Sequence, residues 1–151
     1  MQDLLIEMRD LELTMAELYQ TLARCFAEDG EFFKRIADEE REHAAAVQQV
    51  LDEQIWSPEE TGDEIEEMII TLRNDNASAR RSLALLKQGK IKDRSGALQL
   101  ALALEQSAGE VHGRRLLEQN KNQSLERLLR VLYGMDEGHV TRLRKRLQTE
   151  S

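Results

Sequence analysis

The sequence predicts an all-α protein, organised as a four-helix bundle with a long connection between the second and third helices. Two compositional features favour this class: the 151 residues include only one proline and eight glycines, and β-branched residues are too sparse for a sheet of any size. The third observation is a three-and-four spacing of apolar residues that recurs in four long runs. A chain of this length is expected to form a single domain, residues 1–151, with a sizeable core.

The first two helices are expected to form an antiparallel pair joined by a short turn. The first covers about residues 3–27 and is closed by the turn EDG at 28–30. The second covers about residues 31–54 and ends before Pro58, because proline cannot continue a helix.

The second pair has the same plan. Its first helix begins near Asp93 or Ser95, either of which is a suitable N-cap, and runs to about residue 118. Its second helix follows the turn NKNQ, with Ser124 as candidate cap, and runs nearly to the end of the chain.

The long connection, about residues 55–93, is expected to contain two shorter helices. These cover about 63–73 and 77–88 and are separated by Asn74-Asp75-Asn76.

Polar residues interrupt the apolar stripe of the second helix. Glu40 and His43 lie three residues apart in the middle of the stripe, so both side chains are predicted to point into the bundle. The fourth helix repeats the pattern, with Asp136 and His139 in a stripe of leucines. The other members of the stripe in the second helix are Phe33, Ile36, Ala37, Ala44, Val47, Val50 and Leu51.

The first and third helices each carry one acid in a comparable stripe. These acids, Glu12 and Glu105, are 93 residues apart, and the two acid–histidine pairs are 96 residues apart, which indicates duplication of a helix pair. The rival acids Glu17 and Glu110 lie far from the apolar stripe and are predicted to face solvent.

The inward-facing acids and histidines predict a centre for two metal ions. No Lys or Arg shares the central level of the four stripes, and four uncompensated buried carboxylates would be very unfavourable. Two divalent ions would balance four negative charges, and two neutral imidazoles would complete the ligands. The alternative, a bundle with buried salt bridges, lacks cationic partners. The predicted ligands are Glu12, Glu40, His43, Glu105, Asp136 and His139.

Charge and composition argue against several other functions. The formal net charge of −8 disfavours binding to nucleic acid or to an anionic membrane surface. No apolar run approaches the roughly 20 residues of a membrane span. The N-terminus carries acids where an export signal carries bases, and the single cysteine, Cys25, is expected to be a small residue buried in its helix. We therefore expect a cytoplasmic protein.

The ligand set and two longer motifs resemble the ferritin-like di-iron carboxylate proteins, and rubrerythrins most closely. LELTMAELYQTLA (11–23) is similar to the first-helix motif of that family, and IADEEREHAAAV (36–47) to its second-helix motif. The similarity extends over essentially the whole chain. It implies a single ferritin-like, rubrerythrin-type domain in which a long crossover joins two helix pairs.

The resemblance also implies roles for the ligands. Glu40 and Asp136 would bridge two iron ions (manganese and zinc are alternatives), the glutamates of the first and third helices would be terminal ligands, and each histidine would bind one ion. Tyr19 would be hydrogen-bonded to a carboxylate, although an aromatic residue that fills the core is an equal interpretation. His112 occupies the position that matches Tyr19, where a core histidine is favoured over a spare ligand.

The chain departs from rubrerythrins in three respects. With one cysteine it has no rubredoxin domain, so electrons would come from a partner. Ala108 stands where an additional glutamate is usual, and Asp136 is one methylene shorter than the expected glutamate, which leaves the bridge on that side open.

The implied function is that of a non-haem di-iron oxidoreductase that reduces hydrogen peroxide with electrons from an external redox protein. The alternatives are ferroxidase or iron handling with O₂, as in bacterioferritins, and metal binding without turnover. Because the basic helix end VTRLRKRLQTES needs no partner, we expect a small oligomer. A homodimer that packs Ile6 and Leu13 is the expected state.

Overall fold

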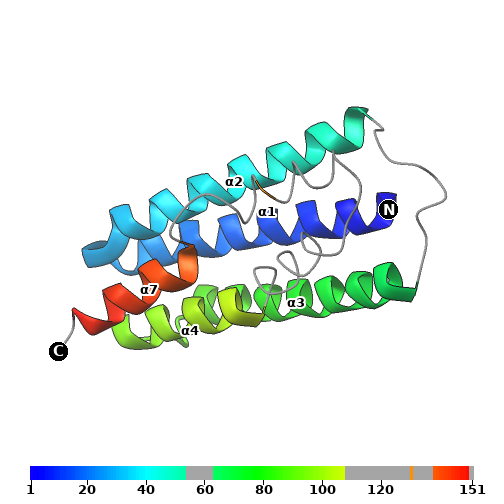
Figure 1. The fold of residues 1–151 in the computed structure, drawn as a ribbon. Helices are drawn as coiled ribbons and strands as arrows, with labels where there is room; N and C mark the ends of the chain where they lie inside the picture. The colour runs from blue at the N-terminus through cyan, green and yellow to red at the C-terminus, as the bar shows by residue number, and fades with distance from the viewer. Residues whose placement is uncertain (54–62, 108–129, 131–137, 150–151) are drawn as a thin grey trace.

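The computed structural model describes residues 1–53, 63–107, 130 and 138–149, and this part of the chain is helical and contains no strand (Figure 1). The all-α prediction is therefore confirmed for the described residues, whereas the ferritin-like arrangement remains a prediction. The elements are α1 (Gln2–Cys25), the 3₁₀ helix η1 (Ala27–Asp29), α2 (Gly30–Glu53), α3 (Asp63–Lys87), α4 (Arg94–Ser107) and α7 (His139–Gln148).

Helix α1 lies between α2 and α3 and packs along both (Figure 1). The predicted stripes explain this packing, because Leu5, Met8 and Leu22 of α1 and Phe33 and Ile36 of α2 are all buried in one hydrophobic core. Helices α4 and α7 pack against each other and complete the described bundle. None of the helices in the described part of the chain is long and apolar enough to cross a membrane.

The prediction of two short helices between α2 and α4 is wrong. Residues 63–87 form one continuous helix, and the expected break at 74–76 lies within it. Asn76 is buried there, and its Oδ1 lies 2.7 Å from Oγ1 of Thr14 on α1. The hydrogen bond to α1 satisfies the amide that would otherwise favour a turn, so tertiary contact overrides the local preference of asparagine.

The turn after α3 has the geometry that glycine allows. Gly89 has a φ of 66°, and its N–H donates to the carbonyl of Leu86 while the N–H of Lys90 donates to that of Leu85. This pair of bonds is a Schellman motif, which ends the helix. Helix α4 then begins with Asp93 as its cap, because Oδ1 accepts a 2.7 Å hydrogen bond from the N–H of Gly96.

A buried aspartate joins three elements at one end of the bundle. The side chain of Asp29, in η1, is fully buried and accepts hydrogen bonds from Nη2 of Arg94 on α4 (3.1 Å) and from Nε of Arg146 on α7 (2.6 Å). Burial raises the pKa of Asp29, but the hydrogen bonds from Arg94 and Arg146 outweigh this effect and hold the pKa below its ordinary value.

Two predictions about exposure have different outcomes. Glu17 is exposed, as predicted, and pairs with Lys87 at 2.6 Å. Cys25 is exposed, so the expectation of a buried cysteine is wrong. Cys25 is the last residue of α1 and lies off the stripe that contains Tyr19 and Leu22, so its side chain does not point into the core that buries them. Glu110 and the predicted turn NKNQ with its cap Ser124 lie outside the described residues.

Candidate metal centre

Five of the six predicted ligands come together between four helices. Helix α1 contributes one carboxylate, α2 a carboxylate and an imidazole three residues later on the same face, α4 a carboxylate, and α7 an imidazole from its first residue. Each carboxylate side chain belongs to a residue that is at most 8% exposed, and both histidines are partly buried. The five residues are Glu12, Glu40, His43, Glu105 and His139.

The first group of donors consists of Glu12, Glu40 and His43. Nδ1 of His43 lies 3.1 Å from Oε2 of Glu40 and 3.6 Å from Oε2 of Glu12. One ligand atom from each residue lies within 4.8 Å of the other two, which is a separation that one metal ion can span.

The second group consists of Glu40, Glu105 and His139. Nδ1 of His139 lies 3.2 Å from Oε1 of Glu40 and 3.3 Å from Oε1 of Glu105. Glu40 therefore belongs to both groups and directs a different oxygen to each histidine. The bridging role that the resemblance implies for Glu40 remains a prediction.

Burial and charge shift the pKa values of the three carboxylates in different directions. Burial, and then the negative charge of Glu40, raise the pKa of Glu12 and of Glu105. Burial also raises the pKa of Glu40, but hydrogen bonds from His139 and His43 outweigh it and leave that pKa far below its ordinary value. The two imidazoles therefore favour the ionised form of Glu40.

The histidines respond to these carboxylates. Burial lowers the pKa of His43, but its contacts with Glu12 and Glu40 more than reverse this and raise the pKa to about 10. Burial likewise lowers the pKa of His139, whose hydrogen bonds with Glu105 and neighbouring glutamates raise it to about 12. The metal-free cluster therefore keeps protons on both imidazoles, and a bound cation would replace them.

Tyr19 lies at the edge of the cluster. Its hydroxyl donates a 2.6 Å hydrogen bond to Oε1 of Glu105, as the resemblance implies, and the side chain is completely buried. Its ring also packs against Phe33 with 6.2 Å between centroids, so Tyr19 fills the core as well. Burial, and then the charge of Glu105, raise the pKa of the Tyr19 phenol well above its ordinary value, which keeps the proton on Tyr19.

One polar residue at the cluster is absent from the sequence prediction. Oε2 of Glu39 lies 2.9 Å from Nε2 of His139, and Oε1 of Glu39 accepts a 2.9 Å hydrogen bond from Nη1 of Arg142. Burial raises the pKa of Glu39, but the hydrogen bonds from His139 and Arg142 lower it to about 2. The sequence shows only that His139 and Arg142, three residues apart, share one face of their helix, and it carries no signal that Glu39 lies opposite that face.

The remaining predicted residues are not placed. Asp136 and His112 lie outside the described residues, as does Ala108. The second bridging carboxylate and the role of His112 therefore stay predictions.

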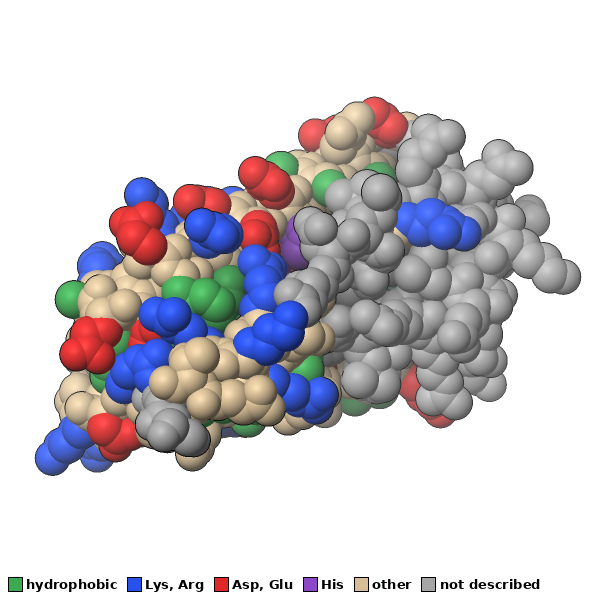
Figure 2. All heavy atoms as spheres, turned by 60° about the vertical axis from the view of Figure 1, so that its left-hand side comes forward, with side chains coloured by type: hydrophobic (Ala, Val, Ile, Leu, Met, Phe, Trp, Pro, Cys, Tyr) green, Lys and Arg blue, Asp and Glu red, His purple; other side chains and the backbone are tan. Residues whose placement is uncertain are grey.

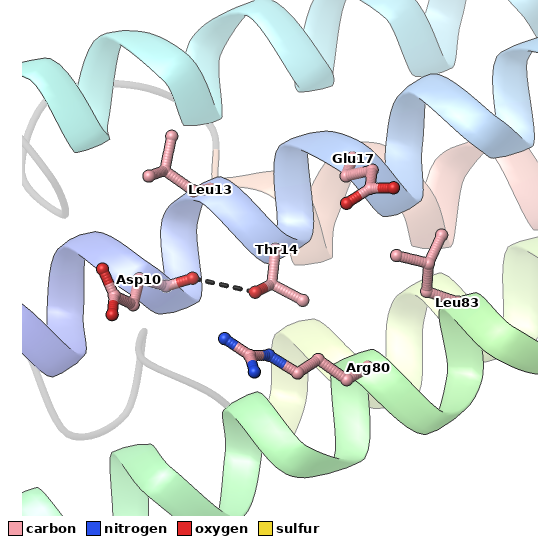
Figure 3. A pocket seen from close by; sticks show the side chains of 6 residues that line it. All are labelled: Asp10, Leu13, Thr14, Glu17, Arg80 and Leu83. Carbon is pink, nitrogen blue, oxygen red and sulfur yellow. Dashed lines mark hydrogen bonds between the residues drawn. The ribbon is translucent and has the colours of Figure 1, made fainter.

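The surface over this region is mixed in charge. On the face drawn in Figure 2, acidic and basic side chains are interspersed and a small area of histidine is visible. A separate surface pocket of about 400 Å³ lies between α1 and α3, where Arg80 extends between the two helices (Figure 3). It contains none of the predicted ligands and is lined by Asp10, Leu13, Thr14, Glu17, Arg80 and Leu83.

The donor set itself tests whether metal ions fit the cluster. Carboxylate oxygens and imidazole nitrogens are suitable ligands for iron, manganese and zinc. In the described part of the chain, His43, His139 and Tyr19 contact the three buried carboxylates, and bound cations would balance the negative charge of these groups. Comparisons with family models, with curated proteins and with solved structures gave no match for this chain.

Proposed function

We propose that this chain is a ferritin-like protein that binds two iron ions inside the bundle and reduces hydrogen peroxide with electrons from an external redox protein. The observation that carries the proposal is that Glu40 belongs to two groups of donors and directs one oxygen to each. A shared carboxylate is the arrangement by which helical bundles hold two metal ions close together. The proposed ligands are Glu12, Glu40, His43, Glu105, Asp136 and His139.

The residues on the buried side of the cluster suit redox chemistry. When bound, a pair of ferrous ions would supply the two electrons that, with two protons, reduce one hydrogen peroxide to two water molecules. Tyr19 holds Oε1 of Glu105 through its hydroxyl, which orients that carboxylate toward the cluster. Tyr19 is completely buried beside the cluster and packs against the completely buried Phe33, so both rings shield this side of the cluster from bulk water.

Oligomeric state is part of the proposal, because a small oligomer has no cavity in which to store iron. Leu13 of α1 is 49% exposed, which supports the expected dimer through the outer face of that helix. The electron donor would be a separate protein, because Cys25 is the chain's single cysteine and cannot build a cysteine-ligated iron site.

The test is anaerobic loading of the metal-free protein with Fe²⁺, followed by rapid mixing with hydrogen peroxide and, separately, with O₂. The di-ferrous protein should be oxidised faster by peroxide than by O₂ and should turn over repeatedly when a reductant is added. Glu40→Ala serves as the inactive control. Uptake of far more than about two irons per chain under O₂ would instead indicate a ferroxidase, and tight binding of zinc with no redox turnover would indicate a metal-binding protein.

A further inference from the structure

Glu39 and Arg142 hold the outer side of the His139 ring. Nε2 of His139 lies 2.9 Å from Oε2 of Glu39, whereas Nδ1 on the opposite side of the ring faces Glu40 and Glu105. Arg142 contacts both oxygens of Glu39, at 2.9 Å from Nη1 to Oε1 and through Nη2 to Oε2. The imidazole is therefore held between the candidate metal ligands and a carboxylate whose plane a guanidinium fixes.

This geometry has a specific consequence for the ring nitrogens. When a metal ion replaces the proton at Nδ1, which is the nitrogen that faces the cluster, the neutral imidazole still donates Nε2–H to the carboxylate of Glu39 and directs its lone pair at the ion. Arg142 presents two parallel N–H groups to Glu39, and this fork prevents the carboxylate from rotating away from His139. Glu39 and Arg142 thus determine both the tautomer and the orientation of His139.

We propose that Glu39, held by Arg142, is a positioning residue for the metal site at His139. This inference rests on the proposed function, because it assigns Glu39 to one of the two metal positions proposed there. It goes beyond that function because it distinguishes the two metal positions. Glu39 contacts the histidine of the position that contains His139, whereas His43, in the other position, contacts Glu12 and Glu40.

A simpler interpretation is that Glu39 and Arg142 form an ordinary ion pair that joins α2 to α7. Their side chains are 31% and 23% exposed, and an ion pair of this kind contributes little to stability by itself. The two interpretations differ in what they predict for metal binding, since a merely structural pair would not change one binding step selectively.

The experiment measures stepwise binding of Co²⁺ to the metal-free full-length chain by calorimetry and by absorption spectroscopy. Glu39→Gln should weaken one of the two binding steps by about 10- to 100-fold and change the spectrum of that step, leaving the other step as in wild type. Arg142→Gln should weaken the same step by a smaller factor. The double variant should be no weaker than Glu39→Gln, because Arg142 acts through Glu39.

Glu42→Gln is the matched control, since Glu42 is an exposed glutamate on the same helix and should bind both ions as wild type does. If the wild type binds no Co²⁺, the proposed function fails. If the wild type binds two ions and both Glu39→Gln and Arg142→Gln bind them with unchanged affinity, the positioning role is overturned while the metal centre stands. An equal loss in both steps, together with a lower melting temperature of the metal-free protein, overturns it as well in favour of a structural ion pair.

Discussion

The imidazole rings of His43 and His139 lie 5.9 Å apart, centroid to centroid, with 24° between their planes. The carboxylate of Glu40 connects them, because Oε2 faces Nδ1 of His43 and Oε1 faces Nδ1 of His139. Helices α2 and α7, which are far apart in the sequence, thus present one nitrogen each to the two sides of a single buried carboxylate.

Replacement of Glu40 should affect both metal positions, whereas replacement of Glu12 should affect one. We expect the metal content of Glu40→Ala to fall from about two ions per chain toward zero, and that of Glu12→Ala to fall to about one. Elemental analysis after loading with Fe²⁺ and gel filtration measures this difference. Glu17→Ala, which removes an exposed acid of the same helix as Glu12, should keep full metal content. Equal losses in Glu40→Ala and Glu12→Ala would contradict the shared role of Glu40.

The metal-free protein should lose stability as the pH rises above neutrality. The folded-state pKa values of His43 and His139, about 10 and about 12, exceed the ordinary value of 6.5. The contribution of the two histidines to the free energy of unfolding is therefore complete below pH 6.5 and is lost as the pH rises through their folded-state pKa values. The raised pKa values of Glu12 and Glu105 act in the same direction, since protonation of either carboxyl relieves repulsion by Glu40.

Bound metal should reverse this trend, because its ligands must be deprotonated. At a free metal concentration of about 100 times the dissociation constant, metal should add about 3 kcal/mol to the free energy of unfolding. Thermal denaturation between pH 5.5 and 9, with chelator and with metal, tests both expectations. Identical melting temperatures with and without metal at neutral pH would be incompatible with a buried metal site.

Asp29→Asn should destabilise the protein at neutral pH, on the order of 2 kcal/mol, because it weakens the charge-assisted hydrogen bonds from Arg94 and Arg146. The pKa of Asp29 is lowered in the folded state, so its contribution is present above the ordinary value of 3.8 and is lost as the pH falls through the folded-state value. The free energies of unfolding of wild type and variant, measured with denaturant, should therefore become equal in acid. Asp38→Asn, in an exposed pair with Arg41, should change stability by less than about 0.5 kcal/mol and serves as control. A difference between wild type and Asp29→Asn that persists unchanged well below pH 3.8 would exclude the ionised carboxylate as its cause.

The spacing of residues within single helices was sufficient to place most of the cluster. Glu12, Glu40 and Glu105 were predicted to be inward because each interrupts an apolar stripe, and all three are buried. The same argument gave the inward position of His43 and His139, both of which are partly buried beside Glu40. Their role as metal ligands remains a prediction.

Spacing within a helix was insufficient where a contact depends on another helix. Residues 74–76 have the local preferences of a turn, yet α3 continues through them because Asn76 meets Thr14 of α1. Glu39 lies one residue from the stripe of α2 and has no special pattern of its own. Its contact with His139, 100 residues later, exists only because α7 packs beside α2.

The sequence by itself determined which faces of α1, α2, α4 and α7 are buried, because the 3.6-residue period is a local property that each helix carries alone. The tertiary structure decided which side chains of different helices meet. Asp29 contacts Arg94 and Arg146, which follow it by 65 and 117 residues, and no pattern within one helix encodes that meeting. Such contacts depend on the relative placement and rotation of whole helices, which the packing of the complete core determines.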